Sequence, residues 1–227
     1  MAWWDLPALL LIVAGFFGAI RLWVVNERRR ERAKPALTVV HDDLGIQHSA
    51  RDVQKALERW AVRVNVTTTK GLSKMLVAVA QKLHERQGAI RFGSARVLKN
   101  LERAQAKIEF DRWTDDARSK FGREVIRADK LGVRRQPKEA TAGVGRDEDG
   151  QPNSYEFFVV SLIVAARQVS FPEELCDTRQ LERILGVLAS LKADQLEAVE
   201  VVWSPASRSD AMALDDMTKR YRALRPL

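Results

Sequence analysis

A run of twelve mostly apolar residues lies in the carboxy-terminal third of the chain: Tyr155-Glu156-Phe157-Phe158-Val159-Val160-Ser161-Leu162-Ile163-Val164-Ala165-Ala166. It is too short to cross a bilayer as a helix, which takes about 20 residues. Its β-branched and aromatic side chains show no alternating polar face, which favours a strand that is buried on both sides. The run therefore predicts the central strand of a sheet.

The segments around this run predict the other elements of one domain. Residues 37–40 and 196–203 have the composition of two further strands. Apolar residues at helical spacing predict helices over about 49–64, 69–83, 97–108, 115–127, 178–188 and 214–221. Because strands and helices do not alternate regularly, we expect an α+β fold. Its small sheet would have about three strands, packed by four to six helices.

The amino-terminal run from Leu6 to Val25 has a single charge, at Arg21. Twenty helical residues span about 30 Å, the thickness of a hydrocarbon core. The run predicts an N-terminal transmembrane helix; a cleaved signal peptide and a buried core helix are the alternatives. We therefore expect a membrane anchor and basic juxtamembrane segment over residues 1–34. A single soluble domain would follow over 35–227, with a loop at about 132–153, where Gly and Pro interrupt the apolar pattern.

Positive charge follows the apolar run and does not precede it. The basic residues immediately after it include Arg28, Arg29, Arg30 and Arg32. The positive-inside rule then predicts a single-pass protein of the inner (plasma) membrane with its soluble domain in the cytoplasm. Basic residues at this position also favour contact with anionic lipid.

The chain has 38 basic and 30 acidic side chains, and the basic excess is concentrated. Residues 86–135 carry 14 basic and 7 acidic side chains. Solvated helix faces are one interpretation of this excess. The other is a membrane or partner surface, which would include Arg91, Arg96, Lys99 and Arg103. No nucleic-acid-binding motif is present, so we expect no nucleic-acid partner.

Residues able to carry chemistry are few, with three histidines and one cysteine in 227 residues. His41, Asp43 and His48 form the best metal-like group, since imidazole and carboxylate together can hold a divalent cation. The alternative is a strand end followed by a turn. Phosphate-binding, dinucleotide-binding and nucleophile-elbow motifs are missing from the sequence. We therefore expect no catalytic residues, no cofactor and no enzymatic activity.

Two of the predicted strands carry a family resemblance. Residues 155–166 look like the core motif of an uncharacterised family, a domain of unknown function found in cyanobacteria and chloroplasts. Residues 195–205 resemble the second strand motif of that family, and residues 210–227 are similar to its carboxy-terminal tail. The family is that of the plant fluctuating-light acclimation protein. The resemblance covers about residues 37–227 and implies a membrane-tethered domain without established catalytic residues.

The sequence thus predicts a protein that acts by binding. We expect a membrane-anchored, non-catalytic adaptor or regulatory module, with membrane lipid and a membrane-bound protein as partners. The alternative is a membrane-tethered enzyme, or a small-ligand or metal sensor, that uses His41, Asp43 and His48.

Overall fold

The computed structural model describes residues 19–23, 36–63, 68–130, 156–205 and 211–227. Within these ranges seven strands form one antiparallel sheet of order β1-β5-β4-β2-β3-β7, in which β6 also pairs with β4. The strands are β1 (Ala19–Trp23), β2 (Leu37–Gln47), β3 (Ile90–Leu101), β4 (Glu156–Arg167), β5 (Leu196–Ser204), β6 (Met212–Ala213) and β7 (Arg225–Pro226).

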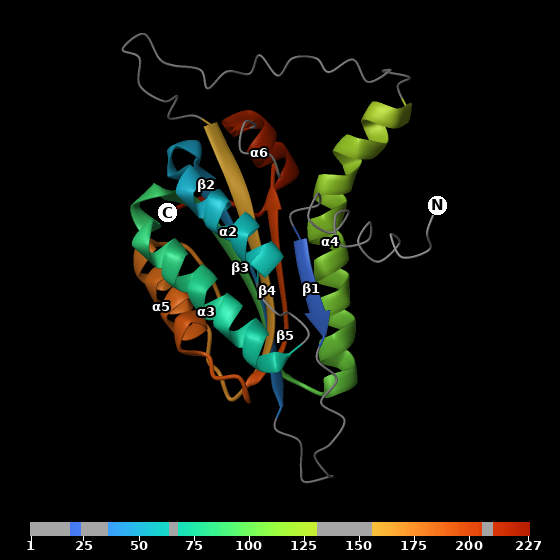
Figure 1. The fold of residues 1–227 in the computed structure, drawn as a ribbon, viewed down its shortest axis with the longest axis vertical. Coiled ribbons are helices and arrows are strands. Elements are labelled where there is room, and N and C mark those ends of the chain that lie inside the picture. Colours follow the sequence, from blue (N-terminus) through green and yellow to red (C-terminus); the bar gives the residue numbers. More distant parts are fainter. Residues whose placement is uncertain (1–18, 24–35, 64–67, 131–155, 206–210) are drawn as a thin grey trace.

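Helices cover both faces of this sheet (Figure 1). Helices α2 (Arg51–Arg63), α3 (Thr69–Glu85) and α5 (Thr178–Ser190) form a layer on one face, and α4 (Arg103–Lys130) covers the other. The short helix α6 (Leu214–Arg220) packs at one end of β4. Two 3-10 turns, η1 (His48–Ala50) and η2 (Gln87–Ala89), precede α2 and β3.

Strand β4 is central, as its sequence predicts. It pairs with β2 on one side and with β5 on the other, and ten of its twelve residues are buried. Because successive side chains of a strand point to opposite faces, β4 contributes to two hydrophobic clusters. Phe158, Val160, Leu162 and Val164 pack beneath α2, α3 and α5, whereas Ile163 and Ala165 pack beneath α4.

Two helix starts follow from local capping. The Thr68 side chain accepts a hydrogen bond from the Gly71 N–H at 3.1 Å and caps α3, whose first residue, Thr69, is the one that the sequence pattern predicts. The Asp177 carboxylate accepts from the Gln180 N–H at 2.7 Å and starts α5. Both side chains satisfy backbone donors that the first helical turn would otherwise leave unpaired.

The expectation of a small sheet with about three strands is wrong. Strand β2 does not end at Val40 but continues to Gln47, and residues 97–101 belong to β3 instead of a helix. Strand β3 pairs with β2 from Leu101 back to Ile90, so pairing along a long neighbour overrides a helical spacing of apolar residues. The short strands β1, β6 and β7 complete the sheet.

The predicted N-terminal transmembrane helix is also not supported. Residues 19–23 of the run from Leu6 to Val25 form strand β1, which pairs with residues 198–202 of β5. The other residues of that run, and the predicted loop at about 132–153, lie outside the described residues. Among the helices of the described ranges, none combines the length and the apolar composition needed to cross a membrane.

The central place of β4 predicts a large effect of truncating its core side chains. Leu162 has no solvent exposure, and Leu162→Ala should lower the free energy of unfolding by about 2–5 kcal/mol, because it leaves a cavity between the sheet and the helices. Denaturant titration of the full-length protein measures this loss. Ile108 of α4 is 59% exposed, so Ile108→Ala should change stability by about 0.5 kcal/mol or less. Equal losses in the two variants would contradict this architecture.

Candidate functional site

Two residues of the predicted metal group, His41 and Asp43, lie on β2 and share the sheet face that α4 covers. The His41 Nε2 atom donates to Asp43 Oδ1 at 3.0 Å, and Arg96 of β3 donates to His41 Nδ1 at 2.5 Å. Arginine has only donors, so Nδ1 accepts and the imidazole proton is on Nε2. Both ring nitrogens are therefore engaged in hydrogen bonds within the protein.

Asp43 is the acceptor on which this network converges. The Ser161 hydroxyl of β4 donates to the same Asp43 Oδ1, and the Lys120 ammonium of α4 lies 3.7 Å from Oδ2. Burial acts to raise the pKa of Asp43, but His41, Lys120 and Ser161 together lower that pKa below its ordinary value. Asp43 is thus a buried carboxylate held by three partners.

Ser161, His41 and Asp43 do not form a catalytic triad. In a triad the histidine accepts the proton of the serine hydroxyl, and the aspartate orients the histidine. Here Ser161 donates to Asp43, and the imidazole nitrogen that could act as a base is occupied by Arg96. All three side chains are buried beneath α4. The arrangement stabilises the packing of α4 and offers no activated nucleophile.

His48 does not join His41 and Asp43. It lies in η1, seven residues farther on, which corresponds to roughly 20 Å along an extended strand. Its neighbours are the Glu156 carboxylate, 3.5 Å from Nδ1, and the Arg51 guanidinium, 3.4 Å away. Within the described ranges, no group of three or more His, Cys, Asp or Glu side chains could hold a metal ion.

The predicted basic surface is largely neutralised by neighbouring side chains. Arg28, Arg29, Arg30 and Arg32 lie outside the described residues. The other predicted surface cations each have a polar partner: Arg91 with Gln47, Arg96 with Asp116, Lys99 with Glu173, and Arg103 with Glu197. These contacts fasten β3 and α4 to their surroundings; the carboxylates neutralise Arg96, Lys99 and Arg103, whereas the amide of Gln47 leaves the charge of Arg91 uncompensated.

Two further carboxylates hold α4 on the sheet. The Glu200 side chain of β5 is fully buried and accepts two hydrogen bonds from Arg118, at 3.0 and 2.7 Å. Glu197 of β5 receives Arg103 from the start of α4 at 2.6 Å and Arg167 from the end of β4 at 2.8 Å. Charge pairs along most of the helix therefore supplement the smaller apolar cluster on this face.

Asp42 is a buried carboxyl that the sequence pattern did not single out. It alternates with His41 and Asp43, so it points to the opposite face, where its strand neighbours Val40 and Leu44 belong to the large hydrophobic cluster. Its exposure is 0%, and neither carboxyl oxygen has a hydrogen-bond partner within the described structure. Burial, and then the charge of Asp43, raise the pKa of Asp42 well above its ordinary value.

Exposed positive charge gathers on the helical layer instead. Helices α2, α3 and α5 carry nine Lys or Arg and four Asp or Glu, a net charge of +5. On α2 and α3, four exposed cations form no ion pair with any described acidic side chain: Lys55 and Arg59 on α2, and Lys70 and Lys74 on α3. Asp52 of α2 bonds to Lys82 and Arg86 at the far end of α3, so the two helices run antiparallel. The four cations thus lie on adjacent helices.

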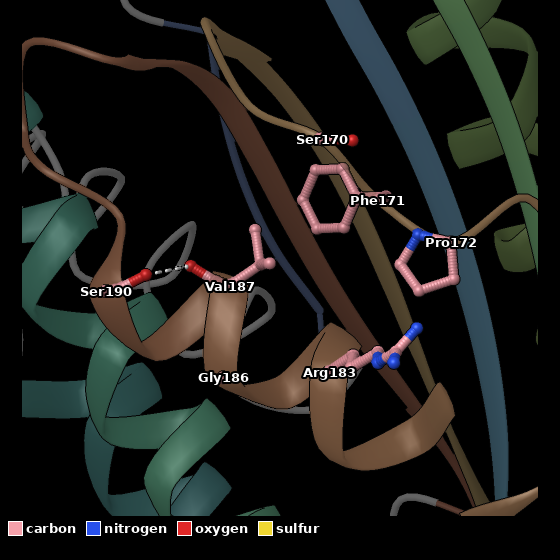
Figure 2. A pocket seen from close by; sticks show the side chains of 7 residues that line it. All are labelled: Ser170, Phe171, Pro172, Arg183, Gly186, Val187 and Ser190. Atoms are coloured by element: carbon pink, nitrogen blue, oxygen red, sulfur yellow. Dashed lines mark hydrogen bonds between the residues drawn. The ribbon is translucent and has the colours of Figure 1, made fainter. Parts of the chain in front are cut away.

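A surface hollow of about 530 Å3 lies beside α5 (Figure 2). The segment that connects β4 to α5 lines it with Ser170, Phe171 and Pro172. The outer side of α5 lines it with Arg183, Gly186, Val187 and Ser190. This volume falls within the range of roughly 300–1,000 Å3 that is typical of ligand sites. Gly186, a glycine in the interior of a helix, was the one sequence signal for it.

Comparison of the sequence with models of known protein families shows to which family the chain belongs. The model of the family DUF1517, described as a protein of unknown function, matches residues 36–227. The chain belongs to the DUF1517 family. This confirms the resemblance that the motifs of β4 and β5 predict.

Two curated proteins illustrate the range of the DUF1517 relatives. Protein FLAP1 homolog A of Synechocystis is 27% identical over 192 residues, which are 84% of this chain and 57% of that protein. FLUCTUATING-LIGHT-ACCLIMATION protein 1, chloroplastic, of Arabidopsis thaliana is 25% identical over 192 residues, 84% of this chain and 46% of that protein. The chain therefore spans about half the length of these relatives. No solved structure matches it.

The raised pKa of Asp42 predicts a pH-dependent loss of stability. The folded state holds this proton more tightly than the unfolded chain, so the stabilisation is complete below the unfolded pKa of about 4 and is lost as pH rises through the folded pKa. Asp42→Asn cannot ionise. The difference in free energy of unfolding between Asp42→Asn and the wild type should therefore grow in favour of the variant, by up to about 1.4 kcal/mol per pH unit above pH 4.

Denaturant titrations from pH 4.5 to 8 measure this gain. Asp52→Asn is the control. Burial acts to raise the pKa of the more exposed Asp52, but Lys82 and Arg86 lower it by more, so Asp52 is ionised throughout this pH range. Its effect on stability should not change with pH over the same interval. Parallel pH curves for wild type and Asp42→Asn would contradict the assignment of Asp42.

Proposed function

We propose that this DUF1517 protein is a non-catalytic adaptor or regulatory binding module that works at a membrane surface. The proposal rests on a contrast between buried polar side chains and exposed cations of this protein. The polar side chains able to take part in chemistry, His41, Asp43 and Ser161, are buried and bonded to one another beneath α4. Four cations of α2 and α3, by contrast, are exposed and form no ion pair with a described acidic side chain: Lys55, Arg59, Lys70 and Lys74.

Anionic lipid is the partner that best fits the exposed cations. Lysine and arginine side chains near an anionic bilayer contribute about 1 kcal/mol each. Trp60 of α2 is only partly buried and lies next to Arg59, and tryptophan favours the membrane interface. The apolar run of residues 6–25 and the basic residues after it also support membrane association.

The membrane in question is a further part of the proposal. From the charge distribution we infer the cytoplasmic side of an inner (plasma) membrane. The two relatives are a cyanobacterial protein and a protein named as chloroplastic, so the corresponding surface in a photosynthetic cell is the first alternative. The name of the Arabidopsis relative refers to acclimation to fluctuating light, which is compatible with a regulatory module.

Vesicle binding tests the membrane surface. Full-length protein is mixed with vesicles of phosphatidylcholine alone or with phosphatidylglycerol added, and the bound fraction is measured by sedimentation. We expect stronger binding to the anionic vesicles. The double variant Lys70→Gln, Lys74→Gln should lose about 2 kcal/mol of that preference, roughly 30-fold in partitioning.

The double variant Lys219→Gln, Arg222→Gln is the matched control. It removes the same charge from exposed positions in and just after α6 and should keep the preference for anionic vesicles. Binding to neutral vesicles is subtracted from binding to anionic vesicles, so any contribution of the apolar amino terminus cancels, because it is the same for both vesicle types. Equal losses in the two double variants would overturn the assignment of this surface.

The alternative, an enzyme or metal sensor that uses His41, Asp43 and His48, has a direct test. Elemental analysis of the purified full-length protein after incubation with Zn2+ or Mn2+ should find less than stoichiometric metal, because His41 and Asp43 already bond to each other and His48 lies apart from them beside Glu156. One equivalent of metal that disappears in His41→Ala, but remains in the exposed-site control His84→Ala, would favour the alternative.

A further inference from the structure

The hollow beside α5 combines three kinds of contact in one place. Phe171, Pro172 and Val187 give it an apolar floor, and Phe171 is only 2% exposed, so its ring is held firmly by the core. Ser170 and Ser190 place hydroxyl groups in its lining, and Arg183 contributes a guanidinium that reaches toward Pro172 (Figure 2). An occupant therefore needs both an apolar and an anionic group.

Arg183 is the charged group of the hollow that has nothing to pair with. It is exposed and forms no hydrogen bond or ion pair with any residue in the described part of the chain. The neighbouring acidic residues are engaged elsewhere: Glu173 with Lys99 at 2.8 Å, and Glu182 with Gln87 at 3.1 Å. The planar guanidinium suits a carboxylate, which it can bind through two parallel hydrogen bonds.

The backbone beside the hollow favours an extended chain over a compact small molecule. Ser170 and Phe171 lie in a segment without regular structure, and neither forms a backbone–backbone hydrogen bond with another described residue. Four of the seven lining residues are exposed, so a small molecule would remain largely in water. A peptide brings its own backbone donors and acceptors to such an open surface.

We propose that this hollow binds an extended peptide segment of a partner protein that carries an Asp or Glu next to an apolar residue. The carboxylate pairs with Arg183, the apolar side chain packs on the partly exposed Pro172 and Val187, and the peptide backbone bonds to the segment at Ser170. This proposal rests on the function proposed above, since it names the chemistry of the protein partner. It uses residues of α5 and of the segment before it, not the cations of α2 and α3 that we propose to meet lipid.

Gly186 allows the hollow to be filled without disturbing the core. A Cβ atom added at Gly186 meets no atom within 4 Å, and its place inside a helix favours any residue other than proline over glycine. Gly186→Trp therefore places an indole ring in the hollow and should keep the fold. Gly186→Ala adds a single methyl group and should leave the hollow open.

A random heptapeptide library displayed on phage is the probe. It is selected on immobilised full-length protein, and peptides that also bind Gly186→Trp are removed. We expect the remaining peptides to be enriched in Asp or Glu adjacent to Leu, Ile, Val or Phe. Failure to enrich any peptide, or enrichment without acidic residues, would overturn the proposal.

Synthetic copies of the enriched peptides then test the charge by fluorescence polarisation. Arg183→Glu should weaken binding by about 10- to 100-fold, the loss expected for a charged hydrogen-bonded pair. Arg179→Glu, one turn earlier on α5 and outside the hollow, should change it by less than about threefold, as an exposed charge does. Equal losses would refute the role of Arg183.

The vesicle measurement separates this proposal from the one on which it rests. Gly186→Trp and Arg183→Glu should bind anionic vesicles as the wild type does. If no peptide binds but the protein still prefers anionic vesicles, only the proposal that the hollow binds a peptide is refuted. If the peptides bind as expected but vesicle selectivity is missing, the membrane surface is refuted and the hollow stands.

Discussion

Strand β4 imposes the constraint on which the rest of the structure depends. Its apolar side chains alternate between two faces, and both faces must be removed from water. A single helical layer would leave half of them exposed. The chain therefore builds a layer of three helices on one side and lays α4 across the other, with β2 and β5 pairing along both edges of β4.

The two layers achieve this burial by different means. Beneath α2, α3 and α5 the contacts are mostly apolar, with Asp42, Gln54 and Ser73 among the polar side chains buried there. Beneath α4 the apolar cluster is small, and buried carboxylates meet cations from the helix: Asp43 with Lys120, and Glu200 with Arg118. Buried charge pairs are costly to form and even costlier to break, so they fix the position of α4 more than they add stability. This explains why the most reactive-looking residues of the sequence are structural.

Sequence patterns identified the elements whose local signals agree with their packing. The buried run of β4 and the start of α5 at Thr178 were predicted correctly because burial and capping act over a few residues. Strand β2 was cut short at His41 because three polar residues in succession indicate a strand end, yet His41 and Asp43 find partners on β3, β4 and α4. Those partners are distant in sequence, and no local pattern reveals them. Residues 97–101 have helical spacing, but pairing with β2 makes them a strand. The hollow was missed for the same reason, since it joins residues 170–172 to residues 183–190 across a helix start.

The distribution of charge connects this architecture to a binding role. A surface cation that pairs with a neighbouring carboxylate contributes little to attraction at a distance, because the pair is nearly neutral when seen from beyond about 10 Å. Arg96, Lys99 and Arg103 are of this kind, although their sequence density suggested a contact surface. Lys70, Lys74 and Arg183 have no such carboxylate among the described residues, so their full charge is available to a partner. Recognition by this fold is therefore expected from the layer whose core is apolar. There the helices are held by hydrophobic contacts, and their outer cations are not needed to hold the fold together.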